Sequence, residues 1–497
     1  MNHHYCSFTI TIKNDFYQEP KTIMKTKGTK YFIFLITLIA ALGGFLFGFD
    51  MAVVSGIIEP LKLQYGLSSA QEGLFVSCAL LGCIVGVGFS GYLSDKIGRK
   101  KVLAISAVLF LISAIGFAFS EAYPILILFR VLAGMGVGVA SNVSPLYISE
   151  VAPSHKRGQL VVFYQLAITI GILAAYISNL FLQRYASSHA GMGNGLLHWL
   201  FVENVWRGMF LVGVIPAAAF CLLLMIVPES PRWLVQFGKN EEALDILTKI
   251  NGEEKAHLEL NSIKEMAIQK SGGYKELLRM PLRKLLTLAM VLTALSQFSG
   301  INGVIFYGPT ILKSAGIVTS DALFYQVILG SANMLFTFVA IFKVDSWGRR
   351  PLYLIGSLCA AFALALTGFC FLMNITGWFM LFSIILFLLF FAFSLGPLKF
   401  VISTEIFPTH IRGTALSMCI MTMWVSDWIV NLLFPMLRDG LGIAATFFIF
   451  SFFCILSFGY AKKKLFETKG KSLEEIEKAW NLDLKAEKKA METKVVH

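Results

Sequence analysis

The chain contains twelve apolar runs, each about as long as a lipid bilayer is thick. A helix needs roughly 20 predominantly apolar residues to cross the hydrocarbon core. Only 14% of the residues are charged, against about a quarter in soluble domains. The pattern predicts an all-α membrane protein with 12 transmembrane helices rather than a β-barrel, whose strands are shorter and alternating. Six runs fall in each half of the chain, at 31–58, 74–93, 102–119, 123–148, 160–182 and 208–227, then at 285–307, 323–342, 352–373, 379–402, 415–437 and 444–460.

The net charge of +12 could indicate a nucleic-acid partner. In a membrane protein, however, basic residues collect in the cytoplasmic loops. We therefore expect both termini in the cytoplasm, a lipid bilayer as partner and no nucleic acid. With the first residue placed inside, the short inner loops hold Lys96, Arg99, Lys100, Lys101, Lys156, Arg157, Lys343, Arg349, Arg350 and Arg412, whereas the outer loops hold only Lys62, Arg184, Arg207, Lys313 and Arg438.

The sequence lacks the patterns of catalysis and metal binding. Its eight cysteines are scattered, without a Cys-x-x-Cys spacing or a neighbouring His that would build a metal site. No nucleophile–base pair and no phosphate-binding loop stands out. We therefore expect neither an enzyme nor a bound metal or cofactor.

A polar stretch of mixed charge separates the two sets of apolar runs. It predicts a cytoplasmic helical linker over 229–284, between a first six-helix half over 31–228 and a second over 285–460. Residues 1–30 and 461–497 are polar and are expected to form cytoplasmic tails.

Three motifs of the first half return in the same order in the second half. Gly91-Tyr-Leu-Ser-Asp-Lys-Ile-Gly-Arg99 is echoed by Val344-Asp-Ser-Trp-Gly-Arg349, and Glu150-Val-Ala-Pro by Glu405-Ile-Phe-Pro. Pro228-Glu-Ser is echoed by Phe466-Glu-Thr. The chain is therefore a duplication, and two parallel six-helix halves around a central cavity are a transporter architecture.

These motifs resemble those of the sugar porter family of the major facilitator superfamily, and its bacterial proton symporters above all. The resemblance covers residues 43–480, and Phe466 stands where the family usually has Pro. It implies the major facilitator fold, alternating access, a sugar or polyol substrate and a functional monomer. The motifs that carry it are Gly91-x-x-x-Asp-Lys-x-Gly-Arg-Lys, Arg130-x-x-x-Gly-x-Gly, Pro228-Glu-Ser-Pro-Arg-Trp, Gln297-Phe-Ser-Gly-Ile-Asn and Phe466-Glu-Thr-Lys-Gly-Lys.

Four charged residues lie well inside the predicted spans: Asp50, Arg130, Lys399 and Asp427. Each such charge costs roughly 2.5–3.5 kcal/mol on insertion scales, so each needs a reason. Asp50 and Arg130 could form a fixed ion pair that only holds two helices together. They could also form a proton switch, in which Asp50 is the carrier because an arginine does not readily lose its proton. The resemblance favours the switch, since an Asp and an Arg at these positions mark proton-coupled porters.

Sugar recognition needs amides for the hydroxyl groups and an aromatic face for the C–H side of the ring. A single amide in a membrane helix is more often an interhelical hydrogen bond, but the resemblance implies a polar cavity. Its matching positions are Gln165, Gln297, Asn302, Asn333 and Trp424. The chain departs from the family at Ile172, Ser296, Phe306 and Phe400, where Gln, Gln, Tyr and Trp are usual. We therefore expect the sugar to be held differently here.

Lys399 and Asp427 lie close to these departures. Lys399 directly precedes Phe400, and Asp427 lies three residues after Trp424, on nearly the same helix face. The alternative for Lys399 is that it snorkels to the membrane surface. We expect Lys399 and Asp427 to pair at the rim of the sugar site and, with Phe400, to take part in binding.

The motifs in the cytoplasmic loops are expected to act as gates. Their charges can form bonds within a half and across to the linker, which would close the inner side when the cavity faces outward. The expected gating residues are Asp95, Arg99, Glu150, Arg157, Glu229, Arg232, Asp345, Arg349, Glu405, Arg412 and Glu467.

The sequence thus predicts proton-coupled uptake of a monosaccharide, a hexose or a pentose, or of a polyol. Two alternatives stay open, an uncoupled sugar facilitator and a sugar sensor of the same fold that does not transport. The first outer loop, 59–70, has no Asn-x-Ser/Thr glycosylation acceptor, which favours a bacterial inner membrane.

Overall fold

The computed structural model describes residues 27–468, with short gaps at 154–156, 192–193, 269–273, 280–281, 315, 318 and 408–410. The described residues hold 12 helical segments that are long and apolar enough to cross a membrane. Because these segments follow the twelve apolar runs, the predicted all-α membrane fold is confirmed. No β-strand occurs in the described part of the chain.

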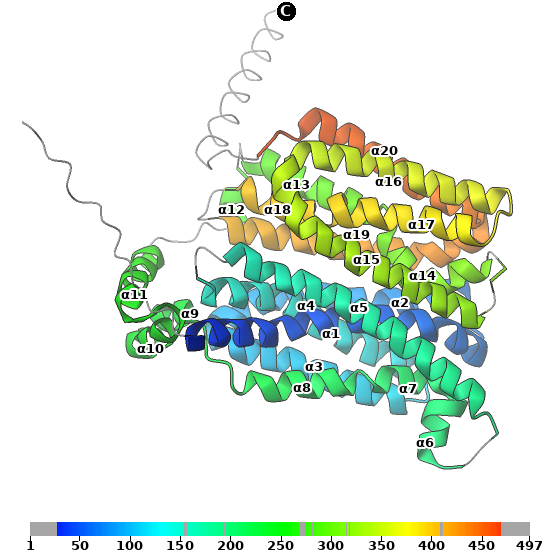
Figure 1. Ribbon diagram of the computed structural model, residues 1–497, viewed down its shortest axis with the longest axis horizontal. Coiled ribbons are helices and arrows are strands. Elements are labelled where there is room, and N and C mark those ends of the chain that lie inside the picture. The colour runs from blue at the N-terminus through cyan, green and yellow to red at the C-terminus, as the bar shows by residue number, and fades with distance from the viewer. Residues whose placement is uncertain are drawn as a thin grey trace, which may run out of the picture.

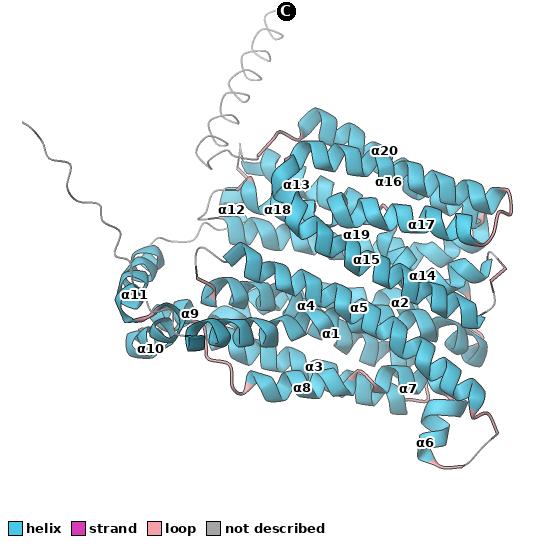
Figure 2. Ribbon diagram, in the orientation of Figure 1, coloured by secondary structure: helices cyan, strands magenta, loops and turns pink. Residues whose placement is uncertain are grey.

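The first six spans form one group of helices and the last six a second group beside it (Figures 1 and 2). The first group comprises α1 (Lys27–Tyr65), α2 (Ser69–Ile97), α3 (Arg99–Phe119), α4 (Tyr123–Val151), α5 (Arg157–Ser188) and a sixth span made of α7 (Val205–Leu211) and α8 (Val214–Leu224). The second comprises α13 (Leu282–Gln297) with α14 (Ile301–Ser314), α15 (Thr319–Trp347), α16 (Arg349–Leu372), α17 (Trp378–Phe390) with the π-helical turn η3 (Phe391–Leu395) and α18 (Gly396–Glu405), α19 (Arg412–Leu441) and α20 (Ile443–Lys464).

Short helices lie at both ends of the bundle (Figure 1). One end carries the linker helices, and we call it the linker end. The other end carries α6 and the π-helical turn η2, and we call it the α6 end. The linker helices are α9 (Pro231–Gln236), α10 (Asn240–Asn251), α11 (Glu253–Ile268) and α12 (Tyr274–Leu277), and those of the opposite end are α6 (Leu196–His198) and η2 (Trp199–Glu203).

Two spans of the second group are broken in mid-membrane. The seventh span breaks between α13 and α14, where Gly300 has a φ of 78°. The tenth breaks at η3, which precedes Pro397, a residue without a backbone N–H. A break frees backbone polar groups and is tolerated in a membrane only inside protein or beside a cavity. The two breaks therefore mark the part of the second group where a polar site can be built.

Glycines let the helices of the first group pack closely. A Cβ added at Gly134 of α4 would collide with the carbonyl oxygen of Ala79 on α2, and one at Gly82 would collide with that of Val131. Gly48 and Gly171 bring α1 and α5 together in the same way. Without a hydrophobic force between helices in lipid, this close approach is what holds them together.

Gly134→Ala is therefore expected to lower the free energy of unfolding by about 1–3 kcal/mol, the usual cost of overpacking. The melting temperature of the purified protein in detergent measures the effect. Gly459→Ala in α20 is the matched control, because nothing lies within 4 Å of a Cβ added there. It should be neutral or slightly stabilising, since Ala forms helices better than Gly. Equal melting temperatures for the two variants would contradict the close α2–α4 packing.

Candidate functional site

Asp50 of α1 and Arg130 of α4 form a buried ion pair in the first group of helices. Arg130 Nη1 donates a hydrogen bond of 2.9 Å to Asp50 Oδ2. The guanidinium also lies over the rings of Phe210 and Phe75, at 5.4 and 6.0 Å from their centroids. The sequence-based expectation that these two charges meet inside the bundle agrees with this geometry.

A single hydrogen bond joins the pair, rather than the two of a forked arginine–carboxylate contact. Asp50 also lines a small cavity, together with Phe110 and Phe210. The Arg130 Nε has no hydrogen-bond partner in the part of the chain that the structure describes. The carboxylate is therefore held loosely enough to exchange partners if water enters the cavity.

A second carboxylate, Asp427 of α19, is buried in the second group and is 2% exposed. Asn302 Nδ2 of α14 donates to Asp427 Oδ2 over 2.6 Å. Asn431 Nδ2, one turn further along α19, donates to Asp427 Oδ1 over 2.8 Å. Both carboxylate oxygens thus accept from amides, and the bond to Asp427 uses one of the two N–H donors of Asn302.

The expected Lys399–Asp427 ion pair is not formed, so this prediction was wrong for the conformation described. The Lys399 ammonium makes no hydrogen bond or ion pair with any residue that the structure describes. Its Nζ lies instead over the aromatic rings of Phe400 and Phe391, at 5.3 and 5.9 Å from their centroids. The Asp427 oxygens accept instead from the two amides, and the two rings stabilise the ammonium.

Unpartnered polar atoms lie beside this cluster. The Gln297 Oε1 at the end of α13 and the Trp424 Nε1 on α19 are buried without a hydrogen-bond partner. Trp424 also packs against Phe47 of α1, with ring centroids 5.4 Å apart. Since a buried polar group costs free energy unless it is bonded, these atoms are suited to a ligand that carries hydroxyl groups.

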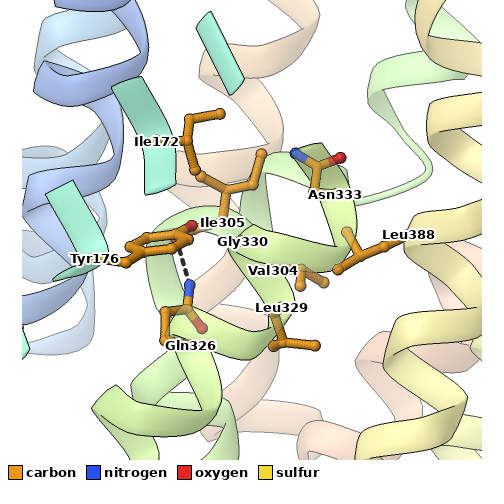
Figure 3. Close-up of a pocket in the computed structure, with 9 residues that line it drawn as sticks. All are labelled: Ile172, Tyr176, Val304, Ile305, Gln326, Leu329, Gly330, Asn333 and Leu388. Carbon is orange, nitrogen blue, oxygen red and sulfur yellow. Dashed lines mark hydrogen bonds between the residues drawn. The ribbon is translucent and has the colours of Figure 1, made fainter. Parts of the chain in front are cut away.

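Asn333 lines another small cavity, which lies between the two groups of helices (Figure 3). Ile172, one of the departures from the family, lines it from α5, and Tyr176 lies one turn further along that helix. The Tyr176 hydroxyl donates to the Ile305 carbonyl over 2.9 Å, and Gln326 Nε2 donates to the same oxygen over 3.1 Å. The close-up also shows the Gln326 amide bonded to Tyr176.

Tyr176 and Gln326 are site candidates that the sequence-based prediction missed. A glutamine inside an apolar run was the available signal for Gln326. Gln165 lies half-buried on α5, two turns before Ile172, and its side chain makes no hydrogen bond to a described residue.

The linker end carries two matching clusters of charge, one in each group of helices. In the first, Arg99 Nε and Nη2 donate to Glu150 at 3.0 and 3.1 Å, and Asp95 lies 3.2 Å from Arg99. The Ser230 hydroxyl donates to Glu150 over 2.5 Å. Glu229 accepts from the backbone N–H groups of Arg99 and Lys100 at 2.9 and 3.2 Å, which caps the start of α3.

The second cluster repeats this arrangement around Arg349. Arg349 Nη2 donates to Glu405 over 2.8 Å, and the Thr468 hydroxyl donates to the same carboxylate over 2.6 Å. Glu467 accepts from the backbone N–H groups of Arg349 and Arg350 at 2.9 and 3.1 Å. The repeated motifs therefore build repeated structure.

The remaining predicted gating residues contribute less to these clusters. Among the described residues, Arg412 donates only to the Phe407 carbonyl, at 3.4 and 3.5 Å, and the Arg232 side chain makes no bond. The side chains of Arg157 and Asp345 lie outside the described residues. The bonds of the two clusters each stay within one half and its following segment, so they hold a half together rather than joining the halves.

The ion pairs between the two groups in the described part of the chain lie at the α6 end. Arg438 at the end of α19 donates to both oxygens of Glu72, at the start of α2, at 3.0 and 3.1 Å. Glu72 is 1% exposed and also accepts from Lys62 over 2.8 Å. Glu59 of α1 and Lys313 of α14 form another ion pair between the groups, at 2.5 Å. The sequence-based prediction counted Lys62, Lys313 and Arg438 only as loop charges and missed these ion pairs. We call the Glu72–Arg438 pair the clamp.

Comparisons with known proteins place this geometry in context. The family model described as sugar (and other) transporter matches residues 36–480. The arabinose-proton symporter of Bacillus subtilis (strain 168) is 40% identical over 464 residues, which covers 93% of this chain and 98% of that protein. The D-xylose-proton symporter of Escherichia coli (strain K12) is 38% identical over 496 residues, with the same coverage.

Solved structures of the xylose transporter XylE from E. coli are similar to this one. Its inward open conformation is 36% identical, with a TM-score of 0.78 over 90% of this chain and 100% of that chain. The complex of the proton:xylose symporter with 6-bromo-6-deoxy-D-glucose has a TM-score of 0.75 at 36% identity, over 91% of this chain and 100% of that chain.

The clamp at the α6 end can be tested with a double-mutant cycle of Glu72→Gln and Arg438→Gln. Each single change is expected to lower the free energy of unfolding by up to about 3–5 kcal/mol, because it leaves a buried charge without its counterpart. The pair should show a coupling of about 1–3 kcal/mol in thermal unfolding.

The exposed pair Lys239–Glu242 in the linker is the matched control, and its coupling should be about 0.3–0.5 kcal/mol. Additive effects of Glu72→Gln and Arg438→Gln would show that the clamp does not hold the halves together.

Proposed function

Because this chain belongs to the family of sugar (and other) transporters, we propose that it takes up a monosaccharide, or a polyol, together with protons by alternating access. The observation that carries the proposal is the buried Asp50–Arg130 pair. A carboxylate and a guanidinium inside the membrane are expensive and mark proton relays in pumps and transporters. Two relatives that match nearly the whole chain are named proton symporters for arabinose and D-xylose.

Asp50 carries the proton in this proposal. An arginine side chain does not readily lose its proton, so the carboxylate is the group of the pair that can carry one. Protonation of Asp50 removes its charge attraction to Arg130. At most one hydrogen bond then remains between these two side chains. Sugar binding and proton binding are then coupled, because both bias the same rocking of the two halves.

The sugar site is proposed around the broken seventh span. Gln297, Asn302 and Trp424 supply an acceptor, a fixed carbonyl acceptor and a donor for sugar hydroxyls. Phe400 offers an aromatic face. Gln165 and Asn333 complete the lining from α5 and α15, which gives the sugar contacts in both halves.

The two ends of the bundle have different roles in the cycle. The clusters around Glu150 and Glu405 keep each half rigid while it rocks. The Glu72–Arg438 clamp joins the halves at the α6 end, and it must open for that side of the cavity to be reached. The linker-end residues predicted as gates therefore act within a half, and the clamp acts between the halves.

The linker end is proposed to face the cytoplasm. Basic residues are concentrated in its short loops, as the positive-inside rule requires. Both termini would then be cytoplasmic, in a bacterial inner membrane, and the chain would work as a monomer. The domain boundaries given above, at 31–228, 229–284 and 285–460, belong to the same proposal.

Asp50→Asn is expected to abolish accumulation of sugar against its gradient while leaving exchange between equal pools largely intact. An asparagine keeps the size and a hydrogen bond to Arg130 but cannot carry the proton. The measurement is uptake of radiolabelled D-xylose, L-arabinose and D-glucose in proteoliposomes with an imposed pH gradient, and Asp245→Asn in the linker is the control. Unimpaired accumulation by Asp50→Asn would refute the proton assignment, and a wild type that only equilibrates sugar would identify a facilitator.

Gln297→Ala and Asn302→Ala are each expected to weaken sugar binding by about 1–3 kcal/mol, the cost of leaving a buried hydroxyl unpaired. Isothermal titration calorimetry on the purified variants measures the change. Gln236→Ala, on an exposed position of α9, controls for general effects of losing an amide. Unchanged affinity in both site variants would mean that these amides only tie helices together.

A further inference from the structure

Lys399 is a buried charge that has no hydrogen-bonded or ion-paired counterpart among the described residues. Lys399 is 9% exposed and lies in α18, directly after the break of the tenth span. The two phenylalanine rings beneath its Nζ stabilise a cation but accept no conventional hydrogen bond. All three N–H donors of the ammonium therefore lack a partner among the described residues.

The nearby carboxylates are already engaged. Asp427 interacts with Lys399 only through longer-range electrostatics, since both its oxygens accept from Asn302 and Asn431. Asp50 is bonded to Arg130 in the other half. A buried ammonium without a close counter-charge is costly, so its presence beside a ligand site points to a ligand that supplies one.

The other free atoms of the site define the rest of that ligand. The Trp424 Nε1 is a further donor without a partner, and Gln297 Oε1 is an acceptor without one. Asn302 uses one of its two amide N–H donors on Asp427, and its carbonyl oxygen accepts no hydrogen bond from a described residue. A complementary ligand carries hydroxyl groups for the amide oxygens and, for Lys399, a group with several acceptor oxygens and a negative charge.

We propose that Lys399 binds the carboxylate of a sugar acid, so that the preferred substrate is an aldonate or a uronate rather than the neutral sugar. This inference rests on the proposed function of sugar transport and narrows its substrate class. The ammonium lies above the two rings with its donors available, and an ionised carboxylate offers the short, charge-assisted bonds that they lack. Phe391 and Phe400 hold the cation in place, which leaves little side-chain entropy to be lost on binding.

Two other roles for Lys399 make different predictions. A lysine that merely balances the charge of Asp427 would affect neutral and acidic sugars alike. A lysine that reaches the membrane surface would affect neither. The comparison of matched neutral and acidic ligands therefore separates all three roles.

The experiment is calorimetric titration of the purified full-length protein with four matched pairs of ligands: D-glucose and D-glucuronate, D-galactose and D-galacturonate, D-xylose and D-xylonate, and L-arabinose and L-arabinonate. Lys399→Met removes the charge at nearly constant length, and Lys399→Arg retains it. Lys249→Met, on an exposed position of α10, is the control for the substitution itself.

We expect at least one acid to bind the wild type tenfold or more tightly than its neutral partner. Lys399→Met should abolish that preference without weakening the neutral sugar, Lys399→Arg should retain most of it, and Lys249→Met should leave it unchanged. If Lys399→Met does not fold, the wild-type pairs and Lys399→Arg still decide the matter.

Tight binding of neutral sugars without preference for any acid would overturn this inference and leave sugar transport standing. An equal loss of both ligand types in Lys399→Met would also overturn it, in favour of the charge-balancing role. Failure of all eight ligands to bind would instead overturn the proposed sugar function itself.

Discussion

The cost of an unpaired charge in a medium without water governs how this protein is built. Three buried carboxylates of the bundle meet that cost with different partners. Asp50 has Arg130, Glu72 has Arg438 and Lys62, and Asp427 has the amides of Asn302 and Asn431. Partners supplied by another helix tie helices together, and a change in any partner shifts how they pack. The same pairs therefore hold the helices together and, when a partner changes, allow the helices to rearrange.

The duplicated sequence produces symmetric structure at one end of the molecule and asymmetric structure at the other. At the linker end, Gly98 and Gly348 both have a left-handed φ, at 100° and 86°, and each leaves room for a carboxylate that caps the next helix. These contacts are local to a half, so duplication preserved them. The clamp between Glu72 and Arg438 instead joins the two halves. Alternating access needs contacts within each half and contacts between the halves, because rigid halves can rock only about contacts that lie between them.

The contacts that sequence reasoning predicted and those it missed differ in a physical way. The Asp50–Arg130 contact was predictable because these two residues, of opposite charge, were the ones identified well inside the apolar runs of the first half. The Lys399–Asp427 pair followed the same logic and was wrong, because Asn302 and Asn431 compete for the carboxylate and aromatic rings take the ammonium. Tyr176 and Gln326 were missed because their partner, the Ile305 carbonyl, belongs to the backbone and leaves no mark in the pattern of side chains.

The sequence by itself determined the twelve spans, the two halves and the paired motifs of the linker end. These follow from properties that are local to a segment: its apolar length against the thickness of the bilayer, and short motifs that bond within one half. Only the tertiary structure decided which partner each buried polar group takes and where the two halves are tied. That choice depends on which helices pack side by side and on how many donors reach one acceptor, and neither is written in any single segment of the chain.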